Sequence, residues 1–160
     1  MKLFKKKPIF DEVQNQKLIE AIQHAEKETS GEVRVYVELR CKYIDAMERA
    51  EELFFQLNMQ HTGDRNGVLV YVALKDRQFA ILGDEGIHKK VGDHFWKKQA
   101  AGKREAFREK QYVDGIVTAV RSIGESLKTY FPHQPDDENE LPDDIIYVCS
   151  SQLKKHCFAS

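Results

Sequence analysis

The most constraining feature of the sequence is a nearly unbroken apolar run over residues 68–74 (VLVYVAL). A strand made only of apolar side chains presents apolar groups on both of its faces, so both faces need cover. The run therefore predicts a central strand in a sheet with helices packed on each side. No apolar run reaches the roughly 18 residues that a helix needs to cross a bilayer, so we expect no transmembrane segment.

Apolar residues recur at helical spacing on both sides of this run. A first helix is predicted from about Asp11, which can form a capping box with Gln14. A second helix is predicted from about Asp45, and a third over residues 87–110. The last helix has the clearest pattern and ends at Pro132. The chain thus alternates strands with amphipathic helices.

Two further segments have strand patterns. Residues 32–40 alternate apolar and polar side chains, which predicts a strand with one buried face and one wetter face. Residues 79–82 are apolar and follow a polar connection too short for a helical crossover, which predicts an antiparallel hairpin. The helix between the first two strands makes those strands parallel. The fold class predicted is α/β, a three-layer α/β/α sandwich with a small mixed central sheet.

The chain of 160 residues fits one domain. We expect a flexible basic arm over residues 1–9, the α/β domain over residues 10–132, and an acidic, disordered tail over residues 133–160. A content of 41% hydrophobic and 32% charged residues is typical of a folded, highly soluble domain.

The net charge limits the classes of binding partner, and the cysteine content indicates the cellular compartment. A formal net charge of -1 argues against nucleic-acid binding, which usually needs a basic face. The three cysteines are odd in number and none is in a CxxC spacing, so neither a disulfide framework nor a zinc site is expected. No apolar signal core follows Met1. These features together predict a cytoplasmic protein.

The predicted strand directions bring distant polar loops together. The start of the first strand, the start of the second and the end of the third should lie at one end of the sheet. Residue Glu32, the loop 63–67 and the turn 83–86 are therefore expected to be neighbours. Oxygen-bearing side chains should converge there: Asp64, Asn66, Asp84, Glu85 and Asp93.

An all-oxygen set of this kind suits a hard cation, Ca²⁺ or Mg²⁺. A bound cation can polarise a phosphoryl oxygen and activate water, with Asp84 or Glu85 as ligand or base. Arg65 could hold a phosphate group with two hydrogen bonds. The alternative is that these Asp, Asn and Gly residues only make turns, for which they are well suited.

Several segments resemble, in order, the strand and loop series of the TPM domain family. They are residues 29–37 (TSGEVRVYV), 66–72 (NGVLVYV), 83–87 (GDEGI) and 91–93 (VGD), and the match covers roughly residues 10–132. The resemblance implies an α/β/α sandwich from a family found in bacteria and chloroplasts. Some members are acid-phosphatase-like, and some bind calcium or related ions near these loops. Many carry a signal peptide and a membrane anchor, neither of which we expect here.

Carried over, the resemblance favours the same five residues as the site: Asp64, Asn66, Asp84, Glu85 and Asp93. It implies a divalent-metal-binding domain with weak acid-phosphatase activity, that is, hydrolysis of phosphomonoesters. The alternative is a non-catalytic, calcium-dependent protein-interaction module. The sequence leaves both open. The expected partners are a divalent cation and either a phosphorylated small molecule or a protein.

Overall fold

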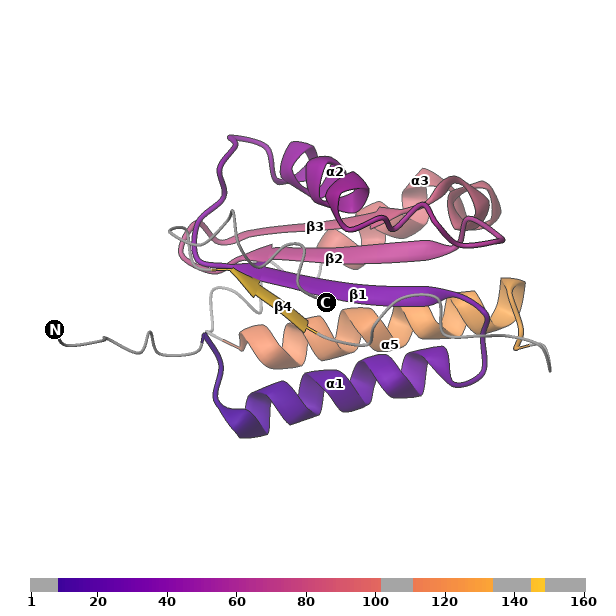
Figure 1. Cartoon of the computed structure of the whole chain (residues 1–160), viewed down its shortest axis with the longest axis horizontal. Coiled ribbons are helices and arrows are strands. Elements are labelled where there is room, and N and C mark those ends of the chain that lie inside the picture. The colour runs from indigo at the N-terminus through magenta and orange to yellow at the C-terminus, as the bar shows by residue number, and fades with distance from the viewer. Residues whose placement is uncertain (1–8, 102–110, 134–144, 149–160) are drawn as a thin grey trace, which may run out of the picture.

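A computed structural model of the chain describes residues 9–101, 111–133 and 145–148. The helices and strands follow one another along the chain, labelled as in Figure 1: α1 (Glu12–Glu26), β1 (Glu32–Glu38), α2 (Ala46–Gln56), β2 (Gly67–Ala73), β3 (Gln78–Gly83), α3 (Glu85–Ala101), α5 (Tyr112–Tyr130) and β4 (Ile145–Val148).

The strands form one mixed sheet in the order β3-β2-β1-β4. As predicted, β1 and β2 are parallel and β2 and β3 are antiparallel. Helices α1 and α5 cover one face of the sheet and α2 covers the other, while α3 lies beside β3 (Figure 1). The three-layer α/β/α sandwich with a small mixed sheet is therefore confirmed.

Two separate apolar cores explain why the central strand is apolar throughout. Alternate residues of β2, such as Val70, pack among the side chains of α1 and α5. The residues between them, such as Leu69 and Tyr71, pack against Leu53 and Phe54 of α2. Because β2 contributes to both cores, any charged side chain on it would lack water on either face.

The helix starts follow their local sequence. Asp11 caps α1 in the predicted capping box: its carboxylate accepts the Gln14 N–H at 2.8 Å, and the Gln14 side chain accepts the Asp11 N–H at 3.0 Å. Asp45 caps α2 by accepting the Met47 N–H at 2.9 Å. In α3 the helical geometry is interrupted at Gly92, which has a φ of 76°. The helix predicted over residues 87–110 is confirmed as far as residue 101, with this break at Gly92, and residues 102–110 lie outside the described part.

The structure corrects two other expectations. All seven residues of β1 are buried, so the wetter face expected for this strand is wrong. The polar side chains on that face are enclosed, as the next subsection shows. Residues 145–148 pair in parallel with β1, so the expectation of a disordered tail over 133–160 is wrong for these four residues. Most of that tail, and the arm apart from Ile9, lie outside the described residues.

Among the described residues, no helix is long and apolar enough to cross a membrane.

Candidate functional site

Strand register brings the predicted loops to one end of the sheet. Glu32 at the start of β1 lies opposite Gly67 at the start of β2. Val68 lies opposite Gly83 at the end of β3, and the Asp84 N–H donates to the Gly67 carbonyl at 2.9 Å. The loop before β2 and the turn after β3 are therefore neighbours, as the sequence predicted. We call this the acidic end of the sheet.

Main-chain contacts hold the loop against the turn. The Arg65 carbonyl accepts the Gly86 N–H at 2.9 Å. A Cβ atom built on Gly86 would lie 2.1 Å from the Asp64 carbonyl oxygen, so only glycine permits this approach. Arg65 itself has a φ of 51°, the left-handed conformation that turns its side chain out of the loop. The two segments thus form one rigid unit.

Arg65 and Asp84 form a two-pronged ion pair. The guanidinium donates from Nε to Asp84 Oδ2 at 2.6 Å and from Nη2 to Oδ1 at 2.8 Å. The Asp84 side chain is 5% exposed, whereas that of Arg65 is 41% exposed. The hydrogen bond and charge of Asp84 raise the pKa of Arg65 despite partial burial. Arg65, predicted to hold a phosphate, therefore has a carboxylate as its partner here.

Glu85 lies at the rim of the same pair. Its carboxylate is 3.6 Å from Arg65 Nη1 and its side chain is 57% exposed. Its N–H donates to Asp84 Oδ1 at 2.8 Å, so Asp84 acts as a cap at the start of α3. Asp84 and Glu85, the predicted catalytic pair, therefore differ: one is enclosed and bonded, the other open to solvent.

Asn66 is the most enclosed of the predicted ligands, at 1% exposure. Its main-chain N–H donates to the Thr62 hydroxyl at 3.2 Å, and its side-chain amide nitrogen donates to the Ser30 hydroxyl at 3.2 Å. Its side-chain oxygen Oδ1 is buried with no hydrogen-bond partner among the described residues. A buried acceptor without a donor is costly, so this oxygen suits a cationic ligand.

The remaining two predicted ligands are exposed. Asp64 lies in the loop with its side chain toward solvent. Asp93 follows the break at Gly92, is 81% exposed, and pairs with His88 Nε2 at 3.4 Å. Among the described residues, no hydrogen bond or ion pair joins Asp93 to the Arg65–Asp84 pair. The structure thus brings Asp64, Asn66, Asp84 and Glu85 to one unit and gives Asp93 a different neighbour.

Within the described residues, no group of three or more His, Cys, Asp or Glu side chains is arranged to hold a metal ion. The donors present at the acidic end are of mixed type: the carboxylates of Asp84, Asp64 and Glu85, the Asn66 amide oxygen, and loop carbonyls. These are all oxygen atoms, which suit Ca²⁺ or Mg²⁺ rather than softer metals.

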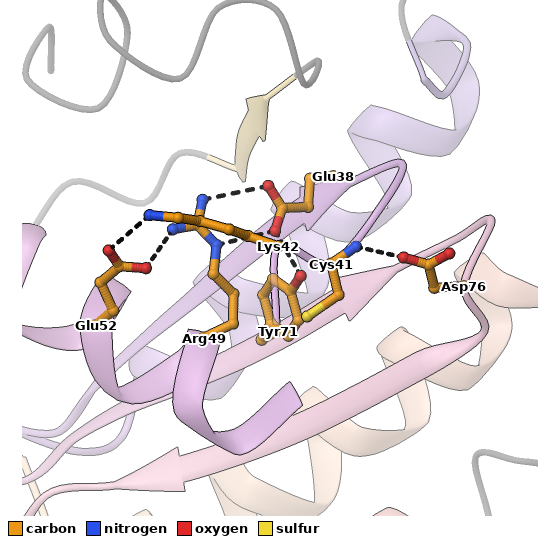
Figure 2. A network of polar contacts seen from close by, with 7 residues as sticks. All are labelled: Glu38, Cys41, Lys42, Arg49, Glu52, Tyr71 and Asp76. Atoms are coloured by element: carbon orange, nitrogen blue, oxygen red, sulfur yellow. Dashed lines mark hydrogen bonds and ion pairs between the residues drawn. The ribbon is translucent and has the colours of Figure 1, made fainter. Parts of the chain in front are cut away.

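The opposite end of the sheet holds a charged network that sequence reasoning missed (Figure 2). Arg49 of α2 donates to Glu38 of β1 from Nε at 3.0 Å and from Nη2 at 3.3 Å. The Tyr71 hydroxyl donates to the same carboxylate at 2.5 Å. The side chains of Arg49 and Glu38 are only 1% and 2% exposed. We call Glu38, Arg49 and Tyr71 the sealed triad.

Burial shapes the protonation of the sealed triad. Burial, reinforced by the bond to Glu38, raises the pKa of the Tyr71 hydroxyl. Burial alone would lower the pKa of Arg49, but its bonds to Glu38 and Glu52 outweigh burial and raise it. One sequence signal was present: Arg49 lies four residues before Leu53 and so falls within the apolar stripe of α2.

Asp76, in the turn between β2 and β3, ties this hairpin to the segment after β1. Its carboxylate accepts the Cys41 N–H at 2.6 Å (Figure 2). It also lies 3.3 Å from Arg40 Nη1. Cys41 is a free, half-buried thiol. Neither residue contacts the acidic end.

Comparison with known proteins places the chain in a family. The TPM domain model matches residues 4–126. The solution structure of the BA42 protein from the psychrophilic bacterium Bizionia argentinensis is 36% identical over 91% of this chain and 100% of its own, with a TM-score of 0.80. The N-terminal domain of the cg2496 protein from Corynebacterium glutamicum is 15% identical over 79% and 88%, with a TM-score of 0.50, and shares the fold. No curated protein matches the chain. With a family model spanning more than half of its residues, the chain belongs to the TPM domain family.

Proposed function

We propose that this TPM domain binds a divalent cation, Ca²⁺ or Mg²⁺, at the acidic end of the sheet. The observation that carries the proposal is the buried Oδ1 of Asn66, an acceptor without a hydrogen-bond donor among the described residues. Asn66 directly follows Arg65, whose guanidinium donates to the Asp84 carboxylate. A hard cation would satisfy this oxygen.

Cation binding would replace the positive charge of Arg65 beside Asp84 with that of the metal ion. Asp84 is enclosed and its counter-charge is Arg65, whose side chain is 41% exposed. Separating an exposed guanidinium from its carboxylate costs little free energy, because water then solvates the guanidinium. We infer that the cation replaces Arg65 beside Asp84, with Asn66 as a second ligand. The exposed carboxylates of Asp64 and Glu85 would supply the remaining ligands of the cation.

The same exchange would create a phosphate site, and this favours phosphomonoester hydrolysis as the activity. Arg65, released from Asp84, presents two parallel N–H donors that match two phosphate oxygens. A bound divalent ion supplies Lewis-acid polarisation of the phosphoryl group. Glu85, exposed beside them, would orient the attacking water. The alternative use of the site is as a calcium-ordered docking face for a protein, without catalysis.

Cation binding is tested by titrating Ca²⁺ and Mg²⁺ into ¹⁵N-labelled protein. The expected result is concerted shifts of the amides in loop 63–67 and turn 83–86. Asp84→Asn should abolish them, whereas Asp76→Asn, at the other end of the sheet, should leave them unchanged. Shifts spread over the surface, or equal binding by Asp84→Asn, would contradict the proposal.

Hydrolysis is tested with p-nitrophenyl phosphate, with and without a chelator. We expect turnover that needs the cation and that falls at least tenfold in Arg65→Met and in Glu85→Gln. Concerted amide shifts without any turnover would reject catalysis and favour the docking face. Turnover that persists in the chelator would reject the cation's part in it.

A further inference from the structure

A hollow of about 240 Å³ lies beside the end of β3. Its apolar lining includes Met47 of α2, Leu82 of β3 and Trp96 of α3. These three side chains are half-buried, so each keeps part of its apolar surface in contact with water. An apolar ligand in a concave site of this kind would remove that surface from water, which is favourable.

The Trp96 ring is held in one orientation. A Cβ atom on Gly83 would lie 2.2 Å from the ring, so the indole rests directly on the strand. Its Nε1–H donates to His88 Nδ1 at 3.0 Å, across the break in α3 at Gly92. The Phe95 ring meets it edge-on, with 4.9 Å between the ring centroids. The indole is therefore a preorganised wall that a ligand does not have to order.

The charges that line the hollow balance one another. Lys97 and Asp93 both line it, and both are exposed. The His88 Nδ1 atom accepts a hydrogen bond, so it carries no proton and the imidazole is neutral. A ligand with a net charge of either sign would be attracted by one of the two charged side chains and repelled by the other. The lining therefore favours a neutral ligand.

The size of the hollow narrows the ligand further. An apolar cavity of about 150 Å³ is large enough to bind benzene. The hollow beside β3 is larger, at about 240 Å³, and has room for a second fused ring. A flat ring system can lie against the indole, and aromatic rings in contact attract one another beyond the area that they bury. The flexible thioether of Met47 adapts to the rest of such a ligand and also contacts aromatic rings favourably.

We propose that this hollow binds a small, neutral aromatic molecule with two fused rings. The rings of the ligand contact the Trp96 indole, and Met47 and Leu82 cover its remaining apolar surface. None of the four described residues assembled at the acidic end lines the hollow. Ligand binding here and cation binding at the acidic end can therefore each fail without the other.

The test titrates 2-naphthol into the ¹⁵N-labelled full chain. This probe has two fused rings, and its phenolic hydroxyl stays protonated and neutral at about pH 7. Trp96 is the only tryptophan in the chain, so its indole N–H gives a single signal. We expect that signal and the amides of Leu82 and Gly83 to shift together along one saturation curve. A linear drift up to the solubility limit, or saturation at other amides without these, would overturn the proposal.

Three related probes test the class of ligand. The probes 2-naphthoate and 2-naphthylmethylammonium keep the rings but carry a negative or a positive charge, and each should bind several-fold more weakly. Decahydro-2-naphthol keeps the hydroxyl and the carbon skeleton but has no aromatic ring, and it should also bind several-fold more weakly. A charged probe that binds as tightly as 2-naphthol would overturn the assignment of a neutral ligand. Equal binding of the saturated probe would overturn aromatic contact with the indole.

Variants test the location, read at the Gly83 amide. Met47→Trp should fill part of the hollow and weaken 2-naphthol binding at least tenfold. Ile44→Trp is the matched control, because Ile44 is 99% exposed and does not line the hollow, and it should bind as the wild type does. Leu82→Ala removes an apolar contact without adding volume and should weaken binding several-fold, which keeps the test decisive if Met47→Trp does not fold. A folded Met47→Trp or Leu82→Ala variant that binds as tightly as the wild type would overturn the assignment to this hollow.

Discussion

The two ends of the sheet each carry an arginine that grips a buried carboxylate with two hydrogen bonds. At one end Arg49 holds Glu38, and both side chains are almost fully enclosed. At the other end Arg65 holds Asp84, with shorter bonds but with the arginine 41% exposed. The chemistry of the two pairs is the same, and what differs is access to water.

This difference separates a structural pair from one that can exchange its cation. In the sealed triad, neither Arg49 nor Glu38 can leave without stranding a charge in an apolar core. In the open pair, the exchange we propose would rotate Arg65 into solvent and place a divalent ion beside Asp84. The comparison predicts that equivalent substitutions will have unequal effects on stability, and that only the one in the open pair will change cation binding.

The largest effect is expected from Arg49→Met. Removing the guanidinium leaves the Glu38 charge buried, with the Tyr71 hydroxyl as its one remaining side-chain partner among the described residues. We expect a loss of about 3–5 kcal/mol in the free energy of unfolding, measured by urea denaturation. Adding Glu38→Gln to the variant should recover part of that loss, because it removes the stranded charge. A loss below about 1 kcal/mol would show that this end is no more sealed than the other.

Tyr71→Phe should have the next largest effect. It removes the hydroxyl that donates to Glu38 at 2.5 Å but keeps the ring that packs against α2. Hydrogen bonds to charged groups are worth more than neutral ones, so we expect a loss of about 2 kcal/mol in urea denaturation. Tyr130→Phe, at a tyrosine that is 44% exposed, is the control and should be neutral. Equal losses in the two variants would contradict a special role for the buried hydroxyl.

Arg65→Met tests the open pair and should destabilise the fold less than either substitution in the sealed triad, measured by urea denaturation. Asp84 keeps the N–H of Glu85 at 2.8 Å, and the lost guanidinium was already partly solvated. The same variant should bind Ca²⁺ more tightly than the wild type, because no internal cation then competes for Asp84. Calorimetric titration measures this affinity. Weaker binding by Arg65→Met would contradict the exchange of Arg65 for the ion.

The meeting of the acidic loops could be predicted from sequence because connection lengths fix strand directions. With a helix between β1 and β2 and a short turn before β3, the starts of β1 and β2 and the end of β3 must lie at one end of the sheet. The partner of Asp84 could not be predicted in the same way. It depends on Arg65 having a φ of 51°, and no local pattern indicates that conformation in an arginine. Asp93 stays a prediction as a ligand; its pairing with His88 follows the break in helical geometry at Gly92, which no local pattern indicates.

The buried polar face of β1 shows a second limit of prediction from the sequence. Alternating polar residues normally indicate a solvated face, yet Arg34 and Glu38 are enclosed. The relevant signal lay elsewhere in the chain, in the arginine within the apolar stripe of α2. Pairing a charge on one element with a charge on another requires knowing which elements touch. The strand β4 was missed because its short apolar stretch follows a strongly acidic segment that dominates the composition.

The smallest effect concerns Glu52, which links the sealed triad to solvent. Its carboxylate accepts Arg49 Nη1 at 2.7 Å and Lys42 Nζ at 3.3 Å, and its side chain is 25% exposed (Figure 2). Burial opposes its ionisation, but the bonds from Arg49 and Lys42 outweigh burial and lower its pKa. The Glu52 side chain is more exposed than that of Glu38 and less exposed than that of Arg65. We therefore expect solvent to screen its interaction with Arg49 in part.

A carboxyl whose pKa is lower in the folded state stabilises the fold above its ordinary pKa of 4.5, and this contribution is lost as the pH falls through the lowered value. Glu52→Gln should therefore cost about 0.5–1 kcal/mol at pH 7, and the difference from the wild type should shrink toward zero in acid. Urea denaturation between pH 3 and pH 7 measures both points. Raising the salt concentration should reduce the difference, since part of the interaction reaches solvent. A difference that stays constant with pH would mean that Glu52 acts by packing alone, and that the boundary between the sealed and the open ends is sharper than its exposure suggests.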